Sequence, residues 1–127
     1  FMRHLTSAIL AVFLTIGAIA SAVMPARAAE LIMIEQAGCV WCARWNAEIG
    51  VAYDKTPEGR AAPLRRVDLH APWPEDLDAI RPERLTPTFV LSENGKELGR
   101  LRGYPGDEFF WVLLDEMLEK NAIKLLD

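Results

Sequence analysis

A pair of cysteines separated by two residues, shortly after a short apolar run, constrains the fold of this 127-residue chain more than any other feature. The run Glu30-Leu31-Ile32-Met33-Ile34 has the length and composition of a buried central strand, and Ala37-Gly38 favours a turn. Cys39 follows that turn, and Cys42 comes three residues later. Beyond Cys42, apolar residues recur four apart, as on one face of a helix: Trp45, Ile49 and Tyr53. We therefore expect a strand, a tight turn and a helix that begins at Cys39.

This placement predicts different roles for the two sulfurs. At a helix N-terminus, free backbone N–H groups and the helix dipole stabilise a thiolate, which lowers the pKa of a thiol placed there. We expect Cys39 to be the attacking sulfur. Cys42 lies one turn further into the helix, so we expect it to be more buried and to resolve a mixed disulfide.

Other uses of the cysteine pair were considered. A bridge between Cys39 and Cys42 closes too small a loop to stabilise a fold strongly. Haem attachment is excluded because Ala43, and not His, follows the second cysteine. Structural zinc needs four ligands, and after residue 28 the chain offers these two cysteines and His70, which we interpret as a loop residue. A Cu(I) carrier that uses both thiolates, a metal shared in a dimer and an inert pair remain as alternatives.

The N-terminal residues 1–28 have the pattern of a signal peptide. A basic start at Arg3 precedes the uncharged run Leu5–Met24, and Ala26-Arg27-Ala28 supplies a cleavage site. We expect export to the periplasm and a single domain over residues 29–127, with an uncleaved membrane anchor as the alternative. The chain has 14 basic and 18 acidic residues, and residues 1–28 hold two of the basic ones, so the domain carries 12 − 18 = −6. This charge argues against nucleic acid as a partner.

The middle of the chain predicts a βαβ unit. Residues 56–63, rich in Pro, Gly and Ala, are expected to form a loop, and residues 64–69 alternate as a strand parallel to the first. Residues 75–80 favour a short helix with Leu77 and Ile80 on one face, stopped by Pro82.

The C-terminal third predicts a hairpin and a helix. Two strands, at 88–91 and 98–102, flank Asn94-Gly95, a pair that favours a tight primed turn. A helix then starts at Asp107-Glu108, with a core-facing apolar stripe formed by Phe110, Leu113, Leu114, Met117 and Leu118.

This order of elements resembles the thioredoxin family, and three local matches support the resemblance. Cys39-Val40-Trp41-Cys42 matches its active-site motif. Thr86-Pro87-Thr88 matches the segment in which the family places a cis-proline, and the Asn-Gly hairpin followed by Gly103 matches the family's hairpin and next glycine. The stretch from Glu35 to Trp45 is further similar to the SoxS type, the periplasmic thioredoxin-like proteins of bacterial sulfur-oxidation systems. The resemblance implies an α/β thioredoxin fold, a central mixed sheet of about four strands flanked by helices.

It also implies a function, a thiol–disulfide oxidoreductase that needs no bound cofactor. The substrate-binding surface would be formed by Trp41, Thr86, Pro87 and Gly103. Met33 stands where thioredoxin keeps a buried aspartate, so we take Glu35 as the candidate proton acceptor.

We expect a monomeric reductase that receives electrons from a membrane dithiol donor and acts on protein disulfides. The SoxS likeness implies a sulfur-carrier protein as its partner. An oxidase or isomerase would use the same residues and remains open.

Overall fold

The computed structural model describes residue 17 and residues 29–127 of the chain. Apart from residue 17, the predicted signal peptide and its cleavage site lie outside these residues, so they remain predictions. Within the part of the chain that is described, no helix is long and apolar enough to cross a membrane.

A four-stranded mixed sheet forms the centre of the molecule, in the order β2-β1-β3-β4. Strand β1 (Glu30–Glu35) pairs in parallel with β2 (Leu64–Asp68) and antiparallel with β3 (Thr88–Glu93), and β3 pairs antiparallel with β4 (Lys96–Arg102). The predicted apolar run is therefore an inner strand, and the parallel pair and the hairpin are confirmed.

The hairpin turn follows from two backbone conformations. Asn94 has φ 54° and Gly95 has φ 75°, the left-handed region that both central residues of a type I′ turn require. This turn matches the right-handed twist of the strands it joins, and it sets the register of β4 on β3.

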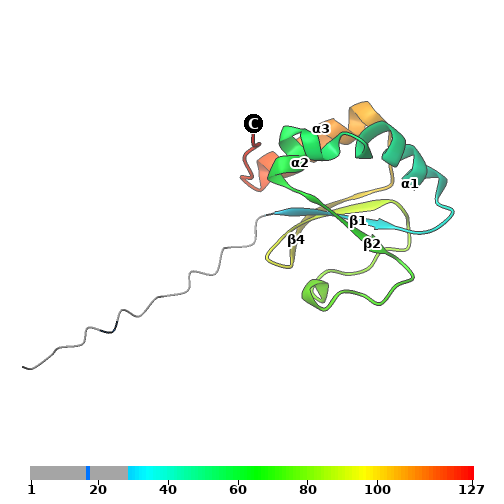
Figure 1. Cartoon of the computed structure of the whole chain (residues 1–127), viewed down its shortest axis with the longest axis horizontal. Helices are drawn as coiled ribbons and strands as arrows, with labels where there is room; N and C mark the ends of the chain where they lie inside the picture. The colour runs from blue at the N-terminus through cyan, green and yellow to red at the C-terminus, as the bar shows by residue number, and fades with distance from the viewer. Residues whose placement is uncertain (1–16, 18–28) are drawn as a thin grey trace, which may run out of the picture.

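Among the described residues, three α-helices lie together on one side of the sheet (Figure 1). Helix α1 (Val40–Trp45) continues as a π-helical segment, η1 (Asn46–Gly50), and a 3₁₀ turn follows, η2 (Tyr53–Lys55). The predicted face is confirmed: Trp45, Ile49 and Tyr53 are all buried. Helix α3 (Asp107–Lys120) starts where the acidic residues predicted it.

The loop prediction for residues 56–63 is wrong, because Pro57–Ala61 forms the short helix α2. Thr56 caps it: the Thr56 hydroxyl oxygen accepts a hydrogen bond from the Gly59 N–H at 3.0 Å. Pro57 occupies the first turn, where its missing N–H costs nothing. Gly59 is needed for close approach, since a side chain there would overlap the main-chain oxygen of Tyr53.

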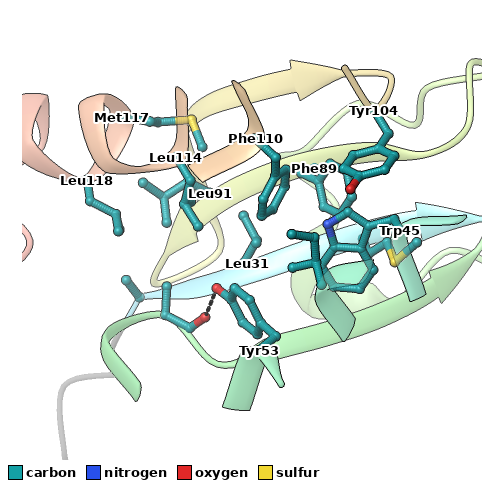
Figure 2. Packing of buried hydrophobic residues seen from close by; sticks show 14 of the residues in the cluster. Leu31, Trp45, Tyr53, Phe89, Leu91, Tyr104, Phe110, Leu114, Met117 and Leu118 are labelled. Atoms are coloured by element: carbon teal, nitrogen blue, oxygen red, sulfur yellow. Dashed lines mark hydrogen bonds between the residues drawn. The ribbon is translucent and has the colours of Figure 1, made fainter. Parts of the chain in front are cut away.

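The alternation of β1 and β3 divides the core between the two faces of the sheet. Leu31, Met33, Phe89 and Leu91 face the helices, where they pack with the buried rings shown in Figure 2. Phe89 and Phe110 both contact Trp45, with ring centroids 5.1 and 5.7 Å from it. Both faces of these inner strands are covered, which explains why β1 is a continuous apolar run. The opposite face is formed by Ile32, Ile34, Val67 and Val90, which pack against Leu77 and Ile80.

Two local expectations need correction. The helix predicted over 75–80 is only a 3₁₀ turn, η3 (Glu75–Leu77), although Leu77 and Ile80 are buried as predicted. The Trp73 indole N–H donates to the Leu77 carbonyl at 2.8 Å and holds this turn against the sheet. On α3, Leu113 is 36% exposed and not part of the core, while the other four residues of the predicted stripe are buried.

An acidic pair between α2 and α3 makes stability depend on pH. Burial, followed by a hydrogen bond with Glu58 and the charge of Glu58, raises the pKa of Asp115 from 3.8 to about 6. The folded state therefore holds this proton more tightly than the unfolded state, so stability falls as pH rises from about 4 to about 6. Asp115 is only partly buried, so solvent screens part of this effect. Asp115→Asn should therefore flatten the dependence and raise stability at pH 7 by on the order of 1 kcal/mol.

Urea unfolding between pH 4 and pH 8 measures the effect. Glu119→Gln, which replaces an exposed acid on the same helix, is the matched control and should keep the wild-type slope. Equal slopes for Asp115→Asn and the wild type would contradict the coupling of Asp115 to Glu58.

Candidate active site

Cys39 caps the N-terminus of α1, as the sequence predicts. The turn before it uses Gly38 at φ 76°, a conformation that favours glycine. The N–H of Cys39 donates to the Gln36 carbonyl at 3.3 Å. The Cys39 sulfur accepts a hydrogen bond from the N–H of Cys42 at 3.1 Å, so the first turn of the helix points a donor at this sulfur. That donor stabilises negative charge on Cys39 when the pair is reduced.

The two cysteines form a disulfide and are unequally buried. Their Cα atoms lie 5.2 Å apart. Cys42 is 4% exposed and belongs to the core on the helix side of the sheet, whereas Cys39 lies at the edge of that core and is partly exposed. A partner can therefore reach Cys39 and not Cys42.

A cavity of about 610 Å³ opens beside the disulfide. Both cysteines line it, together with the turn that precedes α1. The remaining polar groups at its wall come from the ends of β1 and β2 and from η1, namely Glu35, Gln36, Asn46 and Asp68. Cys42 is thus next to a polar space, although its own surface is almost fully covered.

Glu35, the candidate proton acceptor, lines this cavity and is held by a cation. Its carboxylate accepts a hydrogen bond from Arg66 Nη1 at 2.6 Å. The same guanidinium donates from Nη2 to the side-chain oxygen of Asn46 at 2.8 Å. Arg66 also contacts the Met33 sulfur, at 3.6 Å. The charged pair therefore lies beside the position at which the family resemblance implies an aspartate.

The Thr86–Pro87 peptide bond is cis, as the family match implies. The Pro87 carbonyl accepts a hydrogen bond from the N–H of Gly103 at 2.8 Å, which brings these two predicted site residues together. Thr86 Oγ1 accepts a hydrogen bond from Gln36 Nε2 at 2.8 Å. Because Gln36 also bonds the N–H of Cys39 through its carbonyl, the cis-proline segment is connected to the cysteine turn.

Trp41 lies on the surface and is 52% exposed. The Arg44 guanidinium lies over its ring, 5.6 Å from the centroid. Glu48 accepts hydrogen bonds from Arg44 Nε at 2.5 Å and from the Tyr104 hydroxyl at 2.9 Å. These two bonds, with the larger contribution from Arg44, lower the pKa of Glu48. An exposed tryptophan next to Cys39 is thus held in a defined orientation.

Sequence reasoning missed the contact made by His70. This residue does lie in a loop, as expected, but its Nε2 atom is 2.9 Å from Gln36 Oε1. No local pattern points to a contact across 34 positions. Gln36 itself was quoted only as part of the SoxS-like stretch.

Metal ligation was also examined among the described residues. They contain no group of three or more His, Cys, Asp or Glu side chains that could hold a metal ion.

Fold and site together define a class of protein: a redox dithiol of the Cys-x-x-Cys type at a helix N-terminus, on a mixed α/β sheet, connected through Gln36 to a cis-proline segment. Comparison with solved structures narrows this class. The chain is similar to the crystal structure of the reduced periplasmic thioredoxin SoxS from Paracoccus pantotrophus, with 48% identity, a TM-score of 0.70 and coverage of 73% of this chain and 98% of that chain. The chain therefore belongs to the thioredoxin family, and within that family it is similar to the SoxS type.

Two more distant structures share the fold. They are thioredoxin-2 of the malaria parasite and the thioredoxin Mala s 13 of Malassezia sympodialis, each 20% identical with a TM-score of 0.53. The first match covers 71% of this chain and 84% of that chain, and the second covers 72% and 76%. A scan of protein-family models and a search of curated protein sequences each returned no match. The predicted thioredoxin fold and a thiol–disulfide oxidoreductase activity are confirmed.

Proposed function

We propose that this chain is a periplasmic reductase that keeps the cysteines of partner proteins reduced. The observation that carries the proposal is the inequality of the two sulfurs. Cys39 is partly exposed and receives the N–H of Cys42, while Cys42 is 4% exposed. One sulfur can meet a partner, and the other can be reached only from Cys39.

The reaction starts from the reduced dithiol. The Cys39 thiolate attacks one sulfur of the partner's disulfide, and the other partner sulfur leaves and takes a proton from water. Cys42 loses its proton, the Cys42 thiolate attacks the Cys39 sulfur, and the bond from Cys39 to the partner breaks. The second partner sulfur leaves as a thiolate and takes a proton from water. The partner gains two electrons and this protein ends as the Cys39–Cys42 disulfide, the state of the structure. A membrane dithiol donor returns the electrons.

The docking surface lies next to Cys39. Pro87 has no N–H, and among the described residues neither main-chain polar group of Thr86 has a hydrogen-bond partner. An extended segment of the partner can therefore pair with the main chain here. We assign Trp41 and Gly103 to the same docking surface. Gly103 hydrogen-bonds the Pro87 carbonyl, and the exposed Trp41 lies two residues after Cys39, where a tryptophan supplies contact area at low entropic cost.

Glu35 is our candidate for the group that takes the proton from Cys42. The carboxylate and Cys42 line the same cavity, and the Arg66 bond orients the carboxylate. Glu35→Gln should slow resolution of the mixed disulfide by about 10²-fold near neutral pH. The difference in resolution rate between Glu35→Gln and the wild type should become smaller at high pH, where Cys42 ionises without a base. Stopped-flow measurement of the resolution step across pH gives the profile.

Glu75→Gln replaces an exposed acid that does not line the cavity and is the control for the lost charge. A Glu35→Gln profile that runs parallel to the wild type, or coincides with it, would contradict the role of Glu35.

The periplasmic location and the partner rest on the SoxS likeness and on the signal-peptide pattern. The similar Paracoccus protein is described as a periplasmic thioredoxin. We take the partner to be a sulfur-carrier protein with a reactive cysteine, and the role to be its reactivation by reduction.

The redox potential tests the direction of electron flow. Equilibration of the protein against glutathione buffers, followed by quantification of the Cys39–Cys42 disulfide, should give a potential closer to that of reductants, about −270 mV, than to that of strong oxidants, about −120 mV. A potential close to the oxidant value would instead show an oxidase.

A further inference from the structure

Three polar side chains from three separate segments are joined by hydrogen bonds, and one of them is next to the cis-proline in the sequence. Gln36 follows β1, His70 follows β2, and Thr86 precedes Pro87. Gln36 donates from Nε2 to Thr86 Oγ1 at 2.8 Å, and its Oε1 atom lies 2.9 Å from His70 Nε2. The three residues form one hydrogen-bonded chain, which we call the Gln36 relay.

The Gln36 amide uses both of its ends in this relay. With its oxygen toward His70 and its nitrogen toward Thr86, the His70 Nε2 atom is the donor, so the imidazole carries its hydrogen there. The Thr86 hydroxyl and the His70 ring nitrogen can each either donate or accept, so both ends of the amide have a partner. Contacts at both ends restrain the position of the Gln36 side chain.

The outer end of the relay is anchored to the sheet. The N–H of His70 donates to the Asp68 carboxylate at 2.7 Å, and the N–H of Leu69 donates to the Glu35 carbonyl at 2.8 Å. The turn that carries His70 is thus fixed to the end of β1. These bonds restrain the position of the His70 imidazole, which in turn restrains the side-chain amide of Gln36.

The inner end of the relay is Thr86, whose main chain is free to bind a partner. Gln36 is the described residue that hydrogen-bonds the Thr86 hydroxyl, and it also accepts the N–H of Cys39. One residue therefore sets the position of the docking main chain relative to the attacking sulfur. Docking to a preorganised strand avoids the entropy cost of ordering that strand.

We propose that Gln36 and His70 are positioning residues that set the affinity for protein disulfides by holding Thr86. This inference rests on the proposed reductase function. The relay contacts neither sulfur through its side chains, so it acts on binding of an extended partner and not on the reactivity of the dithiol.

The experiment compares a protein disulfide with a small one. Insulin needs the docking strand, whereas 5,5′-dithiobis(2-nitrobenzoate) needs only access to Cys39. For Gln36→Leu, KM for insulin should rise about three- to tenfold, the effect of losing a hydrogen bond, with kcat within about twofold of wild type. The second-order rate with the small disulfide should change less than about twofold. His70→Ala should also raise the KM for insulin.

Thr86 supplies a matched pair of variants. Thr86→Val removes the hydroxyl at nearly constant volume and should raise KM for insulin as Gln36→Leu does. Thr86→Ser keeps the hydroxyl and should have the wild-type KM. The double variant Gln36→Leu with Thr86→Val should be no worse than either single variant, because both break the same bond. These Thr86 variants decide the question if Gln36→Leu fails to fold.

Three results would overturn the proposal. They are an unchanged insulin KM in the variants, an equal loss with both disulfides, and additive effects of Gln36→Leu and Thr86→Val. Failure of the proposed function looks different, because the wild-type protein would then fail to reduce insulin, whatever the rate at which Cys39 reacts with the small disulfide.

Discussion

Cys39→Ser should reduce turnover with any disulfide to the uncatalysed background, a loss on the order of 10³-fold or more. The serine hydroxyl at the helix N-terminus is not ionised near neutral pH, so the group that attacks the partner disulfide is gone. Cys42 cannot replace it, since it is 4% exposed. The variant should also form no adduct with any partner. The measurement is the rate of insulin reduction with dithiothreitol as the electron source.

Cys42→Ser is the control for the stability of Cys39→Ser. Each variant loses the same local disulfide and exchanges one sulfur for oxygen. Thermal unfolding should therefore show two folded proteins. Substantial turnover by Cys39→Ser, with Cys42→Ser inactive toward every disulfide, would reverse the assignment of the two sulfurs.

Cys42→Ser should accumulate a covalent complex with the physiological partner. Attack by Cys39 is intact in this variant, but the sulfur that displaces the partner is missing, so the mixed disulfide persists. Non-reducing gels of periplasmic extract should show a new band that dithiothreitol removes. Mass spectrometry of this band should identify a sulfur-carrying protein with a reactive cysteine.

The same experiment separates the enzyme from a copper carrier. A Cu(I) carrier would use both thiolates equally. Loss of bound copper in both single variants, with no trapped protein in either, would therefore contradict the exchange mechanism. A trapped band in Cys42→Ser and none in Cys39→Ser supports it.

The fold could be predicted from the sequence wherever a local pattern determines the structure. The apolar run at β1, the Asn94-Gly95 turn and the acidic start of α3 all act over a few residues, and each was found where expected. Helix α2 was missed because Pro, Gly and Ala were interpreted as loop composition. The signal was present, since Thr56 before Pro57 is a helix cap followed by the residue favoured in a first turn.

Burial on α3 could not be predicted to the residue. Phe110, Leu113 and Leu114 all fit the period of an amphipathic helix, yet Leu113 lies at the edge of the stripe and is 36% exposed. The width of the buried face depends on what covers it, and that is a property of the sheet and not of the helix.

The site residues fall into two groups, those that a local motif predicts and those that only the folded chain brings together. The cysteines, Trp41 and Pro87 were found because short motifs carry them. The Gln36 relay and the pairing of Glu35 with Arg66 join residues 31 to 50 positions apart. Such contacts arise only when the parallel strands and the cis-proline segment are assembled, and no periodicity in the sequence encodes them.

The central claim, that Cys39 is the nucleophile and Cys42 the resolving sulfur, is tested most directly by brief alkylation of the reduced wild-type protein. A short pulse of iodoacetamide at pH 7, followed by peptide mass spectrometry, gives the labelling rate of each cysteine in one sample. We expect Cys39 to be labelled on the order of tenfold or more faster than Cys42, because a thiolate at an exposed helix N-terminus reacts and a buried thiol does not. Equal labelling, or faster labelling of Cys42, would contradict the account.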